Sequence, residues 1–262
     1  LDSRAKSGMA LVADPATGRI LAMANYPTFN PNSFRQYPTV QLRNRCVADS
    51  FEPGSTFKVF LLSAALEEKL VQPQDGINCE NGRYSFSGRI IRDDHPHARV
   101  SVAEVLKYSS NIGSAKIGLK LGDDRLYRYL KAFGFGEKSE IDLPGEASGS
   151  LRPVSRWYGT DIATISFGQG VSATALQLVA ATSAVANGGM LMKPYLVERV
   201  TDSNGQELQQ IAPQPVRRVI SAQTAATIAR MMEGVTQKGG TGTNAAIEGF
   251  RVAGKTGTAQ KV

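Results

Sequence analysis

The chain has 262 residues, 42% of them hydrophobic, which excludes an intrinsically disordered protein and suits one large domain or two small ones. Lysine and arginine exceed aspartate and glutamate by 30 − 23 = 7, which suits an anionic partner or simply a solvated basic surface. The basic residues do not cluster with aromatic ones, which argues against nucleic acid as a partner, and the longest apolar run, residues 59–66, is too short to cross a membrane.

The first predicted element is a β-hairpin with strands at 9–13 and 20–25. Residues 14–18, Asp-Pro-Ala-Thr-Gly, are typical of the turn between them. Both strands are apolar on both faces, which predicts a sheet covered on both sides. Residues 26–44 are rich in proline and asparagine and are predicted to form a loop.

Pro53 and Gly54 interrupt the chain before an apolar stripe that predicts a helix over 56–69, with Ser55 at its first turn. A short hairpin is predicted around 84–91. Three short helices follow, at 101–108, 111–121 and 124–133. The first opens with a capping-box pattern, and glycine follows each of the other two. These helices predict an all-helical subdomain of roughly residues 70–165.

The last third of the chain alternates helices with strand-like segments. A second capping-box pattern, Thr174-Ala175-Leu176-Gln177, predicts a helix at 174–187. An amphipathic pattern predicts a helix at 221–237, and a short strand is predicted at 196–200. A loop rich in glycine and threonine covers 238–244. Residues 251–258 are predicted to form a strand that carries the last of three candidate functional motifs.

The first motif pairs Ser55 with Lys58. A serine hydroxyl is a weak nucleophile near neutral pH and needs a base within hydrogen-bond reach. Residues three apart on a helix share a face, so Lys58 meets that condition. A lysine acts as a base only when burial or a neighbouring cation lowers its pKa, and Lys255 would be such a neighbour if the fold brings it close. The simpler interpretation is an exposed serine and a solvated lysine.

The second motif, Ser109-Ser110-Asn111, lies where two predicted helices meet. A hydroxyl there can relay a proton, and a carboxamide can bind a substrate amide with both donor and acceptor. Alone, the triplet would more often be a helix cap.

The third motif is Lys255-Thr256-Gly257-Thr258. Gly257 has no side chain, so a ligand backbone can lie against it, and Lys255 with the two threonine hydroxyls could bind a carboxylate. The backbone N–H groups of Ser55 and Thr258 together would form an oxyanion hole. Alone, Lys-Thr-Gly would usually be a turn.

Cysteines and histidines predict little chemistry. Cys46 and Cys79 are the only cysteines, and the sequence is compatible with either one bridge or two free thiols. His95 and His97 lie in a polar loop with an incomplete ligand set, so solvated histidines are the simpler interpretation and no metal site is predicted.

Ser-x-x-Lys, Ser-x-Asn and Lys-Thr-Gly, in that order, are typical of penicillin-binding proteins and serine β-lactamases. From Gly8 to its end the chain resembles the transpeptidase domain of a class B penicillin-binding protein of the division type. Residues 12–23, 51–58 (Phe-Glu-Pro-Gly-Ser-Thr-Phe-Lys) and 166–170 (Ser-Phe-Gly-Gln-Gly) extend the resemblance beyond the motifs.

The resemblance implies an α/β (α+β) fold in which helices flank an antiparallel sheet of about five strands, with the helical subdomain inserted. Residues 1–262 would then form one transpeptidase domain. The family's last two strands, closing helix, N-terminal region and membrane anchor have no counterpart in the sequence. We therefore expect the chain to be a fragment of a longer polypeptide, incomplete at its C-terminus.

The resemblance also implies a peptidoglycan D,D-transpeptidase in which Ser55 forms an acyl-enzyme with D-Ala-D-Ala stem peptides. Lys58 would accept the serine proton, and Ser109 would pass it to the leaving amine. Five residues would bind substrate: Asn111, Lys255, Thr256, Gly257 and Thr258. β-Lactams would acylate the same serine, with no metal or organic cofactor. The implied location is the extracytoplasmic (periplasmic) face of the inner membrane, with a glycosyltransferase of the division or elongation machinery as partner.

Three alternatives share this fold. A serine β-lactamase would hydrolyse the acyl-enzyme quickly, but the Glu-x-x-Leu-Asn loop of the class A enzymes is missing between the second and third motifs. A penicillin-sensing domain would be acylated without transferring the acyl group. A D,D-carboxypeptidase would use water in place of the acceptor amine. The extended similarity to class B favours the transpeptidase.

Overall fold

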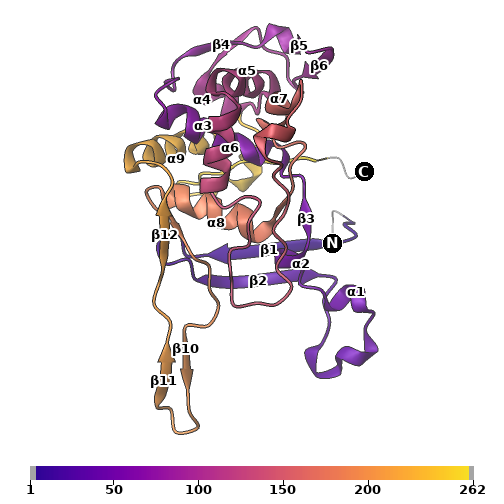
Figure 1. Ribbon diagram of the computed structural model, residues 1–262, viewed down its shortest axis with the longest axis vertical. Helices are drawn as coiled ribbons and strands as arrows, with labels where there is room; N and C mark the ends of the chain where they lie inside the picture. The colour runs from indigo at the N-terminus through magenta and orange to yellow at the C-terminus, as the bar shows by residue number, and fades with distance from the viewer. Residues whose placement is uncertain (1–3, 260–262) are drawn as a thin grey trace.

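Short antiparallel strand pairs surround a helical core in the computed structural model, which describes residues 4–259 (Figure 1). The six pairs within those residues are β1 (Gly8–Ala13) with β2 (Ile20–Tyr26), β3 (Ser50–Phe51) with β8 (Ala173–Thr174), β4 (Gly76–Asn78) with β7 (Arg99–Ser101), β5 (Arg83–Phe86) with β6 (Arg89–Arg92), β9 (Met190–Met192) with β12 (Pro215–Arg218), and β10 (Arg199–Thr201) with β11 (Glu207–Gln210). Helices and antiparallel strands together give the α/β fold expected from the sequence.

The α-helices are α1 (Thr39–Leu42), α2 (Arg45–Ala48), α3 (Lys58–Glu67), α4 (Val102–Lys107), α5 (Asn111–Leu121), α6 (Asp123–Ala132), α7 (Asp161–Ile165), α8 (Ala175–Ala186) and α9 (Ala222–Thr236). The helices predicted from apolar spacing are confirmed to within a few residues. Both predicted capping boxes form, one on Ser101 with Glu104 and one on Thr174 with Gln177.

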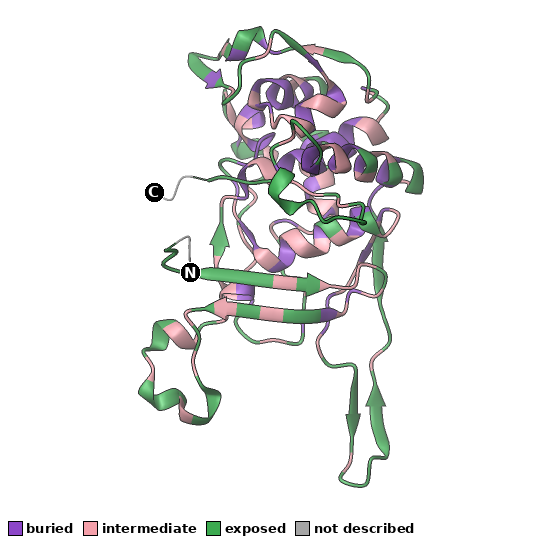
Figure 2. Ribbon diagram, turned by 180° about the vertical axis from the view of Figure 1, so that it is seen from behind, coloured by how far each residue is buried: buried purple, intermediate pink, exposed green. Residues whose placement is uncertain are grey.

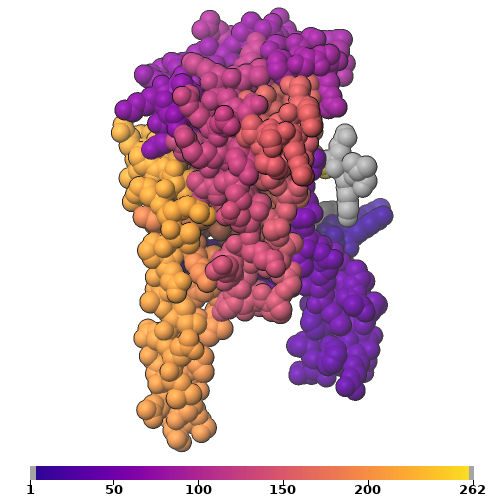
Figure 3. All heavy atoms as spheres, in the orientation of Figure 1, coloured from indigo at the N-terminus to yellow at the C-terminus, as the bar shows by residue number. Residues whose placement is uncertain are grey.

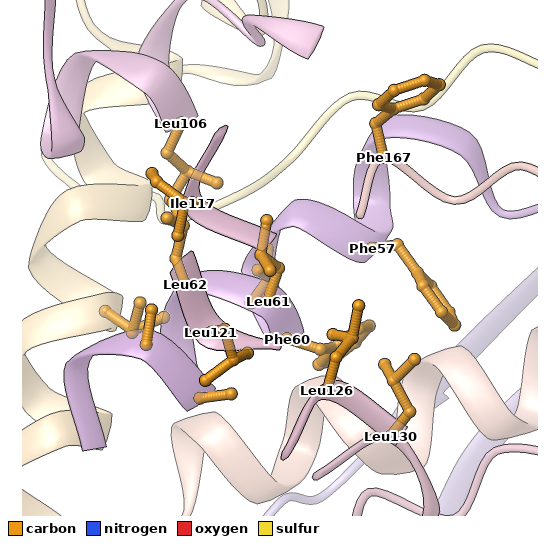
Figure 4. Packing of buried hydrophobic residues seen from close by; sticks show 14 of the residues in the cluster. Phe57, Phe60, Leu61, Leu62, Leu106, Ile117, Leu121, Leu126, Leu130 and Phe167 are labelled. Carbon is orange, nitrogen blue, oxygen red and sulfur yellow. The ribbon is translucent and has the colours of Figure 1, made fainter. Parts of the chain in front are cut away.

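Helix α3 lies at the centre of the core and packs against α5, α6 and α9 (Figure 4). It is apolar on nearly every side, as expected for a helix surrounded by others. The Phe60 ring packs against Phe133 and Phe135, with centroid distances of 5.0 and 4.9 Å. Because full burial of one such side chain contributes about 1.5–3 kcal/mol, this packing fixes the helix that carries the first motif.

The β1–β2 hairpin is confirmed, but the expectation that it is covered on both faces is wrong. Val12 and Leu21 are 52% and 53% exposed. Helices α2 and α8 contact the hairpin from one side, and among residues 4–259 nothing covers the other. The exposed hairpins appear green in Figure 2, whereas the buried residues gather in the helical part.

The strand predicted at 251–258 is also wrong. This segment is irregular, and its backbone is tied to α9 instead of a sheet: Gly254 N–H donates to Met232 O at 3.2 Å, and the Thr236 hydroxyl donates to Val252 O at 2.6 Å. No strand among residues 4–259 lies beside it to complete a ladder.

Two parts of the chain project from the core as separate lobes (Figure 3). One is the fully exposed β10–β11 hairpin, and the other contains α1. No helix in the described part of the chain is both long and apolar enough for a membrane span.

Cys46 and Cys79 are free thiols with no exposed surface. They lie in separate hydrophobic clusters: Cys46 packs with Ile20 and Leu176 beneath the first hairpin, and Cys79 belongs to the main core.

Candidate active site

Ser55 lies in a 3-10 turn, Gly54–Phe57, that leads directly into α3. This places Lys58 one turn after the serine, and Lys58 Nζ donates a hydrogen bond to Ser55 Oγ at 2.9 Å. The Lys58 side chain is fully buried, whereas Ser55 remains partly accessible. Ser55, the potential nucleophile, is therefore accessible to a ligand, while Lys58, its potential base, is shielded from water.

The second motif supplies the other oxygen atoms around Lys58. Lys58 Nζ lies 2.6 Å from Ser109 O, 3.1 Å from Ser109 Oγ and 2.7 Å from Asn111 Oδ1. An ammonium has three N–H donors to share among these acceptors and Ser55 Oγ. In the neutral form, the amine keeps two donors and gains a lone pair that can accept the serine proton.

Electrostatics favour that neutral form. Burial lowers the pKa of Lys58 well below its ordinary value, and the positive charge of Lys255 lowers it further, while Asp93 and Asp94 oppose the shift. Burial also lowers the pKa of Lys255, to about 8. A lysine whose pKa is lowered in this way gives up its proton more readily, which suits it to proton transfer.

The third motif reaches the same centre from the end of the chain. Lys255 Nζ donates to Ser109 Oγ at 2.9 Å and to Thr256 O at 3.0 Å. The Ser109 hydroxyl thus bridges the amino groups of Lys58 and Lys255. The Thr256 hydroxyl is 2.8 Å from that of Thr241, a member of the loop after α9.

Two glycines bring the third motif against the nucleophile. Gly54 has a φ of +53°, and a Cβ added to it would lie 2.3 Å from the carbonyl oxygen of Thr258. A Cβ on Gly257 would lie 2.8 Å from Cγ2 of Thr56. Gly54 N–H also donates a hydrogen bond to Gly168 O at 3.1 Å. The backbones therefore approach at distances that only glycine permits.

A cavity of about 950 Å³ opens beside these segments. Its lining includes Phe51, Pro53, Thr56 and Gly257. The residues of the hydrogen-bonded cluster, Ser55, Lys58, Ser109, Asn111 and Lys255, do not line it, so this cavity adjoins the cluster without containing it.

All of the site residues predicted from the sequence gather here, although they come from three distant parts of the chain. Direct hydrogen bonds join Ser55, Lys58, Ser109, Asn111 and Lys255. Thr256 and Gly257 follow Lys255 along the chain, and Thr258 lies against Gly54. The structure corrects one detail: Asn111 Nδ2 already donates to Arg92 O at 2.9 Å, so only one of its two N–H groups is left for a ligand.

The sequence did not identify Asp93, which lies next to this site. Its carboxylate accepts hydrogen bonds from the second motif, across a sequence separation of 17–19 residues, and no spacing rule predicts such a contact. His97 of the same loop packs against Tyr108 at a ring distance of 4.6 Å. Across residues 4–259, no three His, Cys, Asp or Glu side chains form a group able to hold a metal ion.

Residues 8–262 match the family model described as the penicillin binding protein transpeptidase domain. Among curated proteins, the chain is 42% identical to stage V sporulation protein D of Bacillus subtilis, over 97% of this chain and 40% of that protein. It is 36% identical to peptidoglycan D,D-transpeptidase FtsI of Escherichia coli, over 99% of this chain and 42% of that protein. The chain thus spans about two fifths of the length of these relatives.

Solved structures show the same similarity. The apo transpeptidase domain of penicillin-binding protein 3 from Burkholderia pseudomallei superposes with a TM-score of 0.86 at 35% identity, covering 100% of this chain and 72% of that one. Penicillin-binding protein 3 from Mycobacterium tuberculosis, in complex with aztreonam, gives a TM-score of 0.90 at 34% identity, covering 98% and 59%.

Proposed function

The chain belongs to the penicillin-binding protein transpeptidase family, and we propose that it carries the active site of a peptidoglycan D,D-transpeptidase. The observation that carries the proposal is the buried Lys58 amino group, which contacts Ser55, Ser109 and Asn111 together. A base held against one accessible serine is the arrangement that nucleophilic acyl transfer requires.

In the proposed first step, Ser55 Oγ attacks the carbonyl carbon between the two D-alanine residues of a donor stem peptide, and its proton moves to Lys58 Nζ. The backbone N–H groups of Ser55 and Thr258 stabilise the oxyanion of the tetrahedral intermediate. The C–N bond then breaks, and the leaving D-alanine amine takes a proton through the Ser109 hydroxyl. The 2.9 and 3.1 Å contacts of Lys58 with Ser55 and Ser109 support this route.

In the second step, an amine of an acceptor peptide attacks the Ser55 ester. A new amide bond forms, the C–O bond to Ser55 breaks, and the acceptor proton returns to Ser55 Oγ through Lys58. The cross-link is completed and the serine is restored. The reaction needs no redox partner, because acyl transfer conserves the oxidation state of every atom involved.

Substrate binding falls to the remaining motif residues. We assign recognition of the terminal carboxylate to Lys255 with the hydroxyls of Thr256 and Thr258, and recognition of the donor amide to Asn111. Gly257 leaves room for the ligand backbone. β-Lactams resemble the donor terminus, so the same residues would bind them and Ser55 would be acylated.

The proposal extends to the setting of the domain. We propose one transpeptidase domain across the chain, and the packing of α5 and α6 on α3 supports that unity. The subdomain expected at about 70–165 is not helical throughout, because it also contains β4, β5, β6 and β7. The names of the relatives support a place on the extracytoplasmic face of the bacterial inner membrane. We also propose that the protein acts beside a glycosyltransferase of the division or elongation machinery.

A fluorescent penicillin tests the proposal. The protein should form a stable covalent adduct, and Ser55→Ala should abolish it, whereas Ser203→Ala, at an exposed serine in the β10–β11 turn, should label normally. Labelling of Ser55→Ala would refute the assignment of the nucleophile. Rapid turnover of the adduct would identify a β-lactamase, and a stable adduct without cross-linking of lipid-linked substrate would identify a penicillin-sensing domain.

A further inference from the structure

The turn that carries the second motif is held in an unfavourable backbone conformation. Ser109 has a φ of +61°, a left-handed value that residues with a side chain rarely adopt. This conformation directs both Ser109 O and Ser109 Oγ toward Lys58 Nζ, at 2.6 and 3.1 Å. Such a conformation persists only where the surrounding structure enforces it.

Asp93 supplies much of that enforcement. It follows β6, and its carboxylate accepts three hydrogen bonds from consecutive residues of the turn. Oδ2 accepts from Ser110 Oγ at 2.6 Å, while Oδ1 accepts from the N–H of Asn111 at 2.6 Å and of Ile112 at 3.0 Å. Arg92, its neighbour, accepts from the Asn111 side chain at 2.9 Å. The end of β6 is thus hydrogen-bonded to residues 110–112 through both backbone and side-chain atoms.

Two of these bonds satisfy the start of α5, whose first N–H groups have no acceptor within the helix. Ser110 is already the N-cap residue of that helix, and its hydroxyl accepts from Gly113 N–H at 2.9 Å. Asp93 accepts from the N–H groups of Asn111 and Ile112, which that cap leaves unpaired. It therefore anchors the end of α5 that begins with Asn111 and directly follows Ser109, and both of these residues contact Lys58.

Asp93 also contributes charge. Among residues 4–259, the charged groups that act on Lys58 are Lys255 from the third motif and Asp93 and Asp94 from the loop after β6. The two carboxylates favour the ammonium form of Lys58, and Lys255 disfavours it. Asp94 is exposed and makes no hydrogen bond within the described part of the chain, so it provides charge without contact.

We propose that Asp93 is a positioning residue for acylation, which holds Ser109 and Asn111 against Lys58 and balances the charge of Lys255 at that amine. The inference rests on the proposed function, because it concerns how well Lys58 serves Ser55.

The test follows the rate of acylation by a fluorescent penicillin from neutral to alkaline pH in the intact protein and three variants. Asp93→Ala removes all three hydrogen bonds. Asp93→Asn keeps an acceptor for the two N–H groups but removes the charge. Asp94→Asn is the matched control, since it removes a neighbouring charge and no contact. Thermal unfolding of each variant reports whether it is folded.

Asp93→Ala should lower the limiting acylation rate about tenfold to 100-fold, because small misplacements of reacting groups are that costly. Asp93→Asn should shift the acidic limb of the pH profile to lower pH by about half a unit or more, since loss of a favourable charge makes the ammonium easier to deprotonate. Asp94→Asn should give a smaller shift and an unchanged limiting rate.

The inference is overturned if Asp93→Ala and Asp94→Asn have the same limiting rate, or if Asp93→Asn leaves the limb where it is in the parent protein. If Asp93→Ala unfolds, the pH profiles of the two asparagine variants decide. Failure of the parent protein to label would instead overturn the proposed function, so the two failures are distinguishable.

Discussion

Gly54→Ala should separate the third motif from the nucleophile without unfolding the domain. In the native structure, the new Cβ would lie 2.3 Å from Thr258 O, and the Gly54 N–H is hydrogen-bonded to Gly168 O. Non-bonded contacts of a Cβ are essentially never shorter than 3.0 Å, so the two segments must part by at least 3.0 − 2.3 = 0.7 Å. Because the Gly54 backbone is hydrogen-bonded to Gly168 and leads into the buried helix α3, we expect Thr258 to be displaced.

The expected losses of stability and of acylation rate in Gly54→Ala follow from two effects. Alanine at a φ of +53° costs about 1–2 kcal/mol in backbone strain. The displacement acts on the Thr258 N–H proposed for the oxyanion hole and on the carboxylate site beside it. Since a misplacement of about 1 Å can cost roughly 100-fold in rate, acylation should fall about tenfold to 100-fold. Rates of labelling by a fluorescent penicillin measure this loss, and thermal unfolding measures the strain.

Gly205→Ala is the matched control. Gly205 has a φ of +83° in the distant β10–β11 turn, and nothing lies within 4 Å of the position of its Cβ. It should show the strain of about 1–2 kcal/mol as a fall in Tm of about 2–8 °C, and it should keep a normal acylation rate. Equal acylation rates for the two alanine variants would refute the claim that close approach at Gly54 assembles the site.

Further predictions concern pH and stability. Because the pKa of Lys255 is about 8, its ammonium is lost as pH rises through that value, and affinity for a carboxylate-bearing penicillin should weaken there; Lys255→Ala should bind weakly at every pH, and an identical pH dependence in that variant would contradict the assignment. Leu126→Ala should destabilise the core by about 2–5 kcal/mol in chemical denaturation, since Leu126 is 1% exposed; a loss under 1 kcal/mol would mean that the site repacks. Ser101→Ala should cost about 1 kcal/mol through its capping box, whereas exposed Ser203→Ala should cost nothing measurable.

The helices were predictable because their signals are local. Apolar spacing and the glycine that follows identified α5, and capping boxes located the starts of α4 and α8. The geometry of the first motif followed in the same way, since Lys58 comes three positions after Ser55 and thus lies one helical turn further on.

The rest depends on contacts between distant segments. Residues 251–258 have the composition of a strand, but a strand needs a neighbour to bond with, and this segment instead bonds to α9. The left-handed backbone of Ser109 is stabilised by Lys58 and, through the next residues, by Asp93. Neither Lys58 nor Asp93 is near Ser109 in sequence, so the residues around Ser109 did not predict its left-handed backbone.

The two buried thiols, Cys46 and Cys79, can report local opening of the structure. Burial raises the pKa of Cys46 and of Cys79, so a reactive thiolate forms at either position only when the surrounding packing separates. Cys46 lies beneath the first hairpin and Cys79 in the main core, so alkylation at each sulfur, followed by mass spectrometry, would time the loosening of two regions separately. In an oxidising compartment, the same seclusion would keep neighbouring molecules from joining through sulfur.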